Sequence, residues 1–294
     1  MKILFIGSVD FSRHCLETVL EQEGEVVGIV TRHNDGLNAD FADLGRVASK
    51  YQIPVHYTEN INSAVTIDWV KSRKPDIVFC FGWSQLLKEE LISLPSMGVL
   101  GAHPAMLPKN RGRHPIIWSL VLGLKKTGLT FFFIDSKADA GPILSQKELV
   151  IDDADTAFSL YEKIKLAASE LISEFMPKLL SKTYTVIEQD ESVANTWRKR
   201  TRTDGVIDWR MSAEAIHNLV RALSKPYPGA EFAYKEYSVK VWSTAITEMV
   251  NIENMEPGKV VDIENGAPVI KCQDGALRLL EYEPKISLRI GEYL

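Results

Sequence analysis

The feature that most constrains the fold is the regular alternation of short apolar runs with amphipathic stretches over residues 1–150. The apolar runs have the length of strands, and the stretches between them carry apolar residues at helical spacing. The expected strands are residues 2–6, 25–31, 76–81 and 98–102, and the expected helices are residues 12–22, 43–51 and 61–72. This alternation predicts βαβ units around a parallel sheet, which is a Rossmann-like α/β fold.

The rest of the chain predicts a strand pair, a long helix and a second domain. The strand pair is expected over residues 128–134 and 143–150, and the helix over 154–180. Beyond a change of composition near residues 181–209, one helix around 213–223 precedes short strands that are broken by glycines. We therefore expect a catalytic domain over residues 1–190, a linker over 191–203 and a small β-rich, OB-like domain over 204–294.

Composition favours a soluble, cytoplasmic protein with small ligands. The 294 residues are 45% hydrophobic, which is enough for a large core, and no apolar run reaches the ~18 residues of a membrane span. Cys15, Cys80 and Cys272 lie far apart without metal-ligand spacing, so we expect neither disulfides nor a metal site, and read them as buried apolar groups. The net charge of −5 argues against general nucleic-acid binding.

One histidine stands at the end of an expected strand, directly before a basic loop. His103 follows the run 98–102, so its ring is expected at the carboxyl edge of the sheet, where it can accept a proton from an amine. A hydrogen-bonded structural histidine is the alternative for His103 taken alone. In the loop, Gly112 permits a tight turn, and Arg111 and Arg113 carry guanidinium groups suited to phosphate or carboxylate.

Two further positions acquire meaning only in combination with His103. Asp139 lies in the turn between the two expected strands, where a carboxylate can orient a histidine or simply bond to its own backbone. Gly7 ends the first strand, but a single glycine there makes a poor dinucleotide motif. An ordinary tight turn is the better interpretation of that element by itself.

In combination, these motifs make the chain similar to the N10-formyltetrahydrofolate-dependent formyltransferases, a family that includes methionyl-tRNA formyltransferase and the sugar N-formyltransferases. The motifs that carry the resemblance are Phe5-Ile-Gly7-Ser, Lys74-Pro-Asp76-Ile-Val, His103 with Leu107-Pro108-Lys-Asn-Arg111-Gly112, Thr127-Gly128-Leu-Thr130, Ala138-Asp139-Ala-Gly141-Pro-Ile143, Arg200-Thr, Ile207-Asp-Trp209 and Pro226-Tyr-Pro-Gly229. Within the family the chain most resembles the sugar enzymes, such as the formyltransferase domain that acts on UDP-4-amino-4-deoxy-L-arabinose. That placement is supported by the motif Arg111-Gly-Arg113-x-Pro115, by the tract 216–223, and by the absence of a glycine- and lysine-rich loop after His33.

The resemblance implies transfer of a formyl group from N10-formyltetrahydrofolate to a nucleotide-linked amino sugar of bacterial surface glycans. It implies His103 as general base and Asp139 as its supporting acid. It also implies two small-molecule substrates, no nucleic-acid or membrane partner, and a homodimer. The residues expected at the folate are Gly7, Phe81, Trp83, Leu86, Ala138 and Gly141, and those expected at the acceptor are Asn110, Arg111, Gly112 and Arg113.

One position departs from the family pattern. The family places an asparagine two residues before the histidine, where its amide stabilises the oxyanion of the reaction, and this chain has Gly101. A backbone N–H or a water in the vacated space can replace that donor, or a side chain such as Asn110 or His114 can do so; we favour such a replacement. The alternatives are a catalytically weak protein that binds folate and nucleotide sugar, and a methionyl-tRNA formyltransferase.

Overall fold

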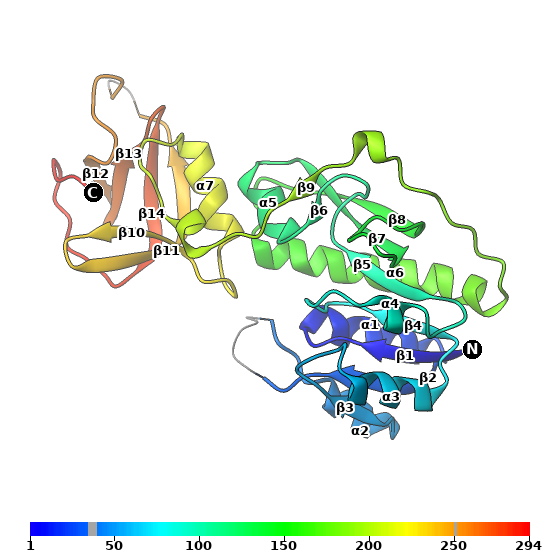
Figure 1. Ribbon diagram of the computed structural model, residues 1–294. Helices are drawn as coiled ribbons and strands as arrows, with labels where there is room; N and C mark the ends of the chain where they lie inside the picture. The colour runs from blue at the N-terminus through cyan, green and yellow to red at the C-terminus, as the bar shows by residue number, and fades with distance from the viewer. Residues whose placement is uncertain (35–39, 250–251) are drawn as a thin grey trace. The chain divides into compact units, whose positions relative to one another are not determined.

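The computed structural model describes residues 1–34, 40–249 and 252–294, and their contacts define two compact units (Figure 1). Unit 1 comprises residues 1–113, 127–150 and 162–197. Unit 2 comprises residues 114–126, 151–161 and 198–294.

Unit 1 is built on a mixed sheet that is mostly parallel. Among the described residues, seven strands follow the order β3-β2-β1-β4-β5-β7-β8. Their bounds are β1 Lys2–Ile6, β2 Glu25–Thr31, β3 Val55–Tyr57, β4 Ile77–Cys80, β5 Val99–His103, β7 Lys126–Phe133 and β8 Ile143–Val150. Strands β1 to β5 pair in parallel and β7 runs antiparallel to β5, so the predicted Rossmann-like fold is confirmed.

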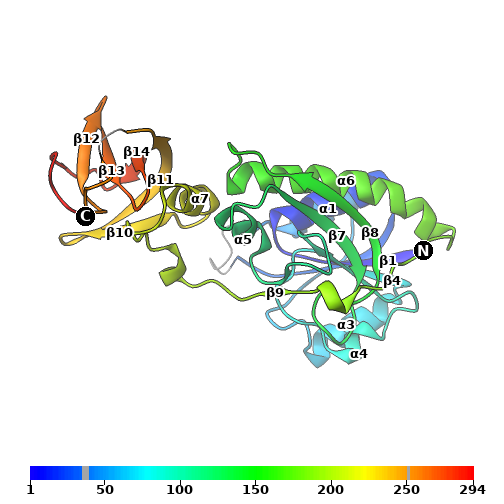
Figure 2. The ribbon, with the colours of Figure 1, turned by 90° about the horizontal axis from the view of Figure 1, so that it is seen from above.

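Helices cover both faces of this sheet. Successive strand residues point to opposite faces, and both sets are apolar and buried, so each face needs a helical layer. Their bounds are α1 Asp10–Glu21, α2 Leu44–Tyr51, α3 Ala64–Arg73, α4 Glu89–Ile92 and α6 Ala157–Leu180. On one face, Phe79 and Phe131 pack their rings against Phe175 of α6, which runs along β7 and β8 in Figure 2. On the other face, Leu4 and Val78 belong to a buried cluster with residues of α3.

Unit 2 is a small β-rich domain with helices packed beside its sheet. In the part of the chain that the structure describes, its five strands pair antiparallel in the order β10-β11-β14-β13-β12. Their bounds are β10 Ala230–Tyr234, β11 Tyr237–Thr247, β12 Val260–Glu264, β13 Ala267–Lys271 and β14 Ala276–Glu283, and the helices are α5 Pro115–Val121 and α7 Ala213–Ala222. The β-rich character is confirmed, and OB-like closure of the sheet stays a prediction.

The division into units differs from the continuous boundaries expected from the sequence. Residues 114–126 and 151–161 belong to unit 2, although both precede the linker that we predicted over 191–203. Helix α5 packs against α7, and the buried Arg221 of α7 donates to the carbonyl oxygens of Asp152 and Asp155 at 3.1 and 2.9 Å. The units are defined by contacts between residues far apart in the sequence, and local composition does not indicate such contacts.

The three cysteines are buried, as predicted. Burial raises the pKa of the Cys80 and Cys272 thiols to about 12 and that of Cys15 well above its ordinary value. Within residues 1–34, 40–249 and 252–294, no helix is long and apolar enough to cross a membrane. The same described residues contain no group of three or more histidine, cysteine, aspartate or glutamate side chains placed to hold a metal ion.

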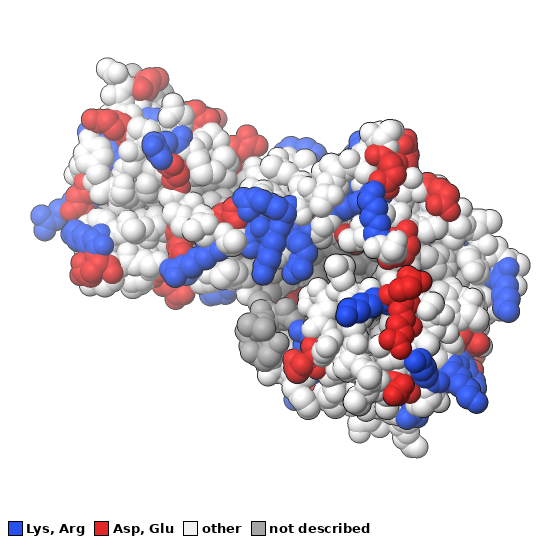
Figure 3. Space-filling model, viewed as in Figure 1, with Lys and Arg blue, Asp and Glu red and all other residues white. Residues whose placement is uncertain are grey.

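The basic segment 198–202 follows the short strand β9, Thr196–Trp197, and basic side chains gather there in Figure 3. Arg198 and Arg202 are 62% and 76% exposed and pair with Asp204 and Glu231, whereas Arg200 is buried with its guanidinium 4.6 Å from the centre of the Trp118 ring. Carboxylates of unit 2 therefore compensate much of this charge.

Candidate active site

His103 is the last residue of β5, and one hydrogen bond selects the tautomer of its neutral ring. The residue is 5% exposed, and Nε2 lies 2.8 Å from the carbonyl oxygen of Asn110. Because a carbonyl oxygen only accepts hydrogen bonds, the neutral ring carries its proton on Nε2. Nδ1 is therefore the basic nitrogen of this histidine.

Asp139 reaches the same place from the turn between β7 and β8. Its backbone is left-handed, with φ +56°, a conformation that aspartate tolerates better than most residues. Its Oδ2 accepts the N–H of Gly112 at 2.9 Å and lies 3.8 Å from Nδ1 of His103. The structure thus brings the two predicted catalytic side chains together, with the carboxylate beside the nitrogen that would take up a proton.

The loop between β5 and α5 contains three residues with positive φ, one of which is His114 with φ +57°. Asn110 has φ +65° and Gly112 has φ +101°, and a Cβ at Gly112 would lie 2.2 Å from the carbonyl oxygen of Trp197. Only glycine fits that close approach. Arg111 and Gly112 form the short strand β6, which pairs in parallel with β9.

The two arginines of this loop have different environments. Arg111 is 4% exposed, and its guanidinium donates to Gln189 and Glu191 at 2.7 Å each, so the predicted contact of Arg111 with an acceptor is wrong for this structure. Sequence analysis missed this because the two partners lie 78 and 80 positions away. Arg113 is exposed and its side chain bonds to no described residue, so it stays a proposed contact.

Gly101 does not leave empty space on β5. A Cβ at this position would lie 2.9 and 3.1 Å from Cγ1 and Cδ1 of Ile134 and 3.2 Å from Phe132. The idea that a water fills a vacated asparagine site is therefore wrong, since Ile134 fills it. A backbone N–H, Asn110 and His114 stay candidate replacements. The backbone oxygen of Asn110 accepts from His103, and its side-chain amide has no hydrogen-bond partner among the described residues.

Gly101→Asn is expected to lower the free energy of unfolding by about 1–3 kcal/mol, because the new side chain meets Ile134 in a packed sheet. Urea denaturation of the Gly101→Asn protein measures this cost. In an Ile134→Ala background the same substitution should cost clearly less, because the methylene and methyl groups that it meets are gone. Equal costs in both backgrounds would show that Ile134 does not occupy the position.

The residues predicted at the folate fall into two groups. The Phe81 ring is fully buried against Phe5 and Phe131, so it is not open to a ligand in this structure, and the placement of Phe81 at the folate stays a prediction. The donors of the β1–α1 turn are also engaged: Gly7 N–H bonds to Val30, and those of Ser8 and Val9 reach Ser12 Oγ. This confirms an ordinary tight turn.

Other predicted folate residues are more open. Leu86 is 76% exposed, Ala138 is exposed, and the half-buried Trp83 ring lies under the Arg32 guanidinium at 4.4 Å. Gly141 is buried, and a Cβ there would meet the Phe133 carbonyl oxygen at 1.9 Å. Part of the segment after His33, residues 35–39, lies outside the described residues, so the absence of a basic loop there stays a sequence observation.

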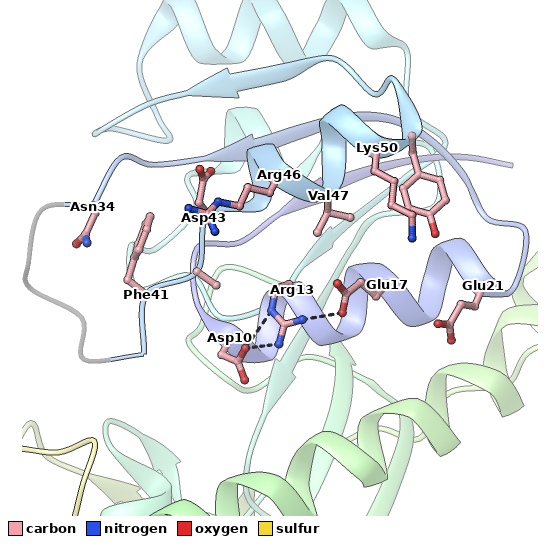
Figure 4. Close-up of a pocket in the computed structure, with 12 residues that line it drawn as sticks. Asp10, Arg13, Glu17, Glu21, Asn34, Phe41, Asp43, Arg46, Val47 and Lys50 are labelled. Carbon is pink, nitrogen blue, oxygen red and sulfur yellow. Dashed lines mark hydrogen bonds and ion pairs between the residues drawn. The ribbon is translucent and has the colours of Figure 1, made fainter.

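A separate cavity of about 750 Å³ lies between α1 and α2 (Figure 4). Figure 4 shows Arg13 extended along α1, with its guanidinium bonded to Asp10 and Glu17. None of the predicted site residues lines this cavity. Because its walls carry both signs of charge and Arg13 is neutralised internally, it does not supply the chemistry of His103 and Asp139.

Comparison with known proteins accounts for both units. The formyl transferase family model matches residues 1–176, and the model of the formyl transferase C-terminal domain matches residues 199–294. The chain belongs to the formyl transferase family. The first model spans β1 to β8 and includes both His103 and Asp139 of this family member.

Several solved structures share the fold. An N-formyltransferase from Helicobacter canadensis, in complex with folinic acid and dTDP-3-aminofucose, matches with a TM-score of 0.72 and 20% identity over 95% of this chain and 98% of that chain. Methionyl-tRNA formyltransferase from Clostridium thermocellum matches with a TM-score of 0.60 and 19% identity over 84% and 94%. HypX from Aquifex aeolicus, in complex with tetrahydrofolic acid, gives a TM-score of 0.69 and 19% identity, and the match covers 95% of this chain and 43% of HypX.

Three residues that were not predicted contact the loops that carry His103 and Asp139: Gln189, Glu191 and Asn195. Gln189 bonds to Arg111 and to carbonyl oxygens of the Asp139 turn, and Asn195 accepts the backbone N–H of Asn110 at 2.8 Å. These residues lie in the stretch of changed composition near 181–209. The polar side chains of this stretch indicated an exposed segment, and no local pattern indicated which residues they contact.

Proposed function

We propose that this formyltransferase moves the formyl group of N10-formyltetrahydrofolate to the amine of a nucleotide-linked amino sugar used in bacterial surface glycans. The observation that carries the proposal is the basic Nδ1 of His103, 3.8 Å from the Asp139 carboxylate. An uncharged amine that attacks a carbonyl carbon must lose a proton, and a histidine is suited to take it.

In this mechanism, a bond forms between the amine nitrogen and the formyl carbon, the bond from that carbon to N10 of the folate breaks, and N10 gains a proton. Nδ1 of His103 accepts the proton that the amine loses. The Asp139 carboxylate stabilises the resulting imidazolium, while the Asn110 carbonyl oxygen holds Nε2–H and fixes the ring. The side-chain amide of Asn110 takes the place of the family asparagine and donates to the formyl oxygen as it gains negative charge.

The acceptor assignment rests on charge and on the solved relatives. Arg113 offers an exposed guanidinium on the same loop as His103, suited to the phosphates of a sugar nucleotide. The net charge of −5 favours such a small anion over a transfer RNA, whose binding depends on many phosphate contacts. The Helicobacter canadensis enzyme supports this choice, because it was solved with an amino sugar on a nucleotide. Cytoplasmic location and a homodimer belong to the same proposal.

The test uses the full chain with N10-formyltetrahydrofolate and a panel of nucleotide-linked amino sugars, in parallel with methionyl-tRNA. Release of tetrahydrofolate only with an amino sugar, together with an N-formyl product in the mass spectrum, is the expected result. Formylation of methionyl-tRNA would replace the proposed acceptor. Tight binding of folate and sugar nucleotide with no product would assign a binding protein and would reject the enzymatic proposal.

A further inference from the structure

The segment that follows α6 returns across both loops of the active site. This returning segment, residues 187–197, runs past β8 to β9 in Figure 1. Ile187 exchanges two backbone hydrogen bonds with Ile143 at 2.8 and 2.9 Å. At the other end, the carbonyl oxygen of Asn195 accepts the N–H of Arg111 at 3.0 Å. The segment thus contacts the Asp139 turn and the His103 loop in sequence.

Gln189 joins the two loops through a single side chain. Its Nε2 donates to the carbonyl oxygens of Asp139 and Gly141 at 2.9 and 2.7 Å. Its Oε1 accepts from Nε and Nη2 of Arg111 at 3.2 and 2.7 Å. The amide N–H groups of Gln189 therefore bond to the Asp139 turn, and its amide oxygen bonds to the loop that carries Arg111.

Ion pairs at Glu191 also join the two loops. The guanidinium also pairs with Glu191 at 2.7 Å, and Lys137 of the Asp139 turn pairs with the same carboxylate. The hydrogen bonds from Arg111 and Lys137 hold the pKa of Glu191 at about 2, so this carboxylate stays ionised at neutral pH. Arg111, Glu191 and Lys137 thus form a second connection between the loops.

We propose that Gln189 is a positioning residue that sets the spacing between His103 and Asp139, a role that rests on the function proposed above. The two side chains are too far apart, at 3.8 Å, to fix each other by a hydrogen bond. His103 is instead held by the Asn110 carbonyl, next to Arg111. Asp139 is held at its carboxylate by the Gly112 N–H and at its backbone carbonyl by Gln189. Since a misplacement of about 1 Å can cost roughly 10²-fold in rate, this connection controls catalysis.

Two variants separate the functions of this side chain. Gln189→Glu keeps an oxygen for Arg111 but turns a charged oxygen toward the carbonyls of Asp139 and Gly141. Gln189→Met has similar length and no hydrogen bonds. We expect kcat to fall about 10²-fold in both, with the KM for the folate donor changed by less than about threefold. Glu188→Gln is the matched control, because Glu188 is exposed and bonds to no described residue, and it should behave as the wild type.

The pH profile distinguishes positioning from a general loss of structure. In Gln189→Glu, protonation of the introduced carboxylate restores one O–H donor for these carbonyls. The rate of this variant relative to the wild type should therefore rise as the pH falls through the pKa of that carboxylate, which the neighbouring Arg111 lowers. The same ratio should stay constant for Gln189→Met, whose side chain does not titrate. A constant ratio for both variants, or no loss of kcat in either, would contradict the proposal.

Amide hydrogen exchange at Gly112 supplies a readout that needs no enzymatic activity. The Gly112 N–H donates to Asp139 Oδ2 at 2.9 Å, so its exchange should accelerate at least tenfold when the Asp139 turn shifts. We expect this in both Gln189 variants and not in Glu188→Gln. If the wild type transfers no formyl group to any acceptor, the proposed function fails while this measurement still tests Gln189. Unchanged Gly112 exchange in both variants would overturn the positioning role.

Discussion

His103→Gln is expected to lower kcat by about 10²- to 10⁴-fold, because it removes the basic nitrogen that faces Asp139. Glutamine retains an N–H group that can donate to the carbonyl oxygen of Asn110, so the buried site keeps its packing better than with alanine. The measurement is the steady-state rate of tetrahydrofolate release with the best acceptor from the panel. Binding of the folate donor, followed by calorimetry, should change little.

His14→Gln is the matched control for this substitution. His14 lies on α1 and bonds through Nε2 to Ser169 of α6 at 2.7 Å, so the change alters a histidine of unit 1 that has no part in the site. Its rate should equal that of the wild type. A His103→Gln protein that folds normally and keeps full turnover would show that another group takes the proton.

The second large effect is expected at Asn110. Asn110→Gly should lower kcat by about 10²- to 10³-fold, the usual cost of removing one donor to a developing oxyanion. Glycine accepts the φ of +65° at this position and retains the backbone carbonyl that holds His103. The substitution therefore removes the side-chain amide alone, and single-turnover kinetics report its effect on the chemical step.

Lys109→Ala serves as the control on the same loop, because Lys109 is exposed and forms no side-chain bond to a described residue. It should leave the single-turnover rate within about threefold of the wild type. If Asn110→Gly behaves like this control, the oxyanion is stabilised by a backbone N–H group or by another side chain. The proposed compensation for Gly101 would then be rejected.

Much of the fold and the centre of the site were predictable because they depend on local pattern. Apolar runs of strand length and helical spacing between them indicated the parallel sheet of unit 1, which the structure contains. His103 was predicted at a strand end and ends β5, and Asp139 was predicted in a turn and lies between β7 and β8. Because β7 runs antiparallel to β5, with Phe133 opposite Leu100, strand ends alone do not bring these two positions together. The turn that carries Asp139 reaches the loop after His103, where Asp139 Oδ2 accepts the Gly112 N–H.

Other expectations failed where the decisive contact comes from a distant part of the chain. Arg111 has the chemistry of an anion-binding residue, yet Gln189 and Glu191 occupy its guanidinium. A water was one expected replacement at Gly101, yet Ile134 of the segment after β7 fills that space. The predicted domain boundaries missed residues 151–161, which the carbonyl contacts of Arg221 place in unit 2.

The sequence by itself determined the class of fold and the family, and it singled out His103 and Asp139, the pair proposed to carry the acid and base chemistry. These features were predictable because hydrophobic periodicity and turn residues depend on neighbours a few positions away. The family motifs are short runs of residues that can be recognised in the sequence. Only the tertiary structure decided which ring nitrogen of His103 is basic, that Arg111 is internal, and that Gln189 links the two loops. Those properties depend on hydrogen bonds between residues up to about 80 positions apart, whose partners are chosen by packing and not by local pattern.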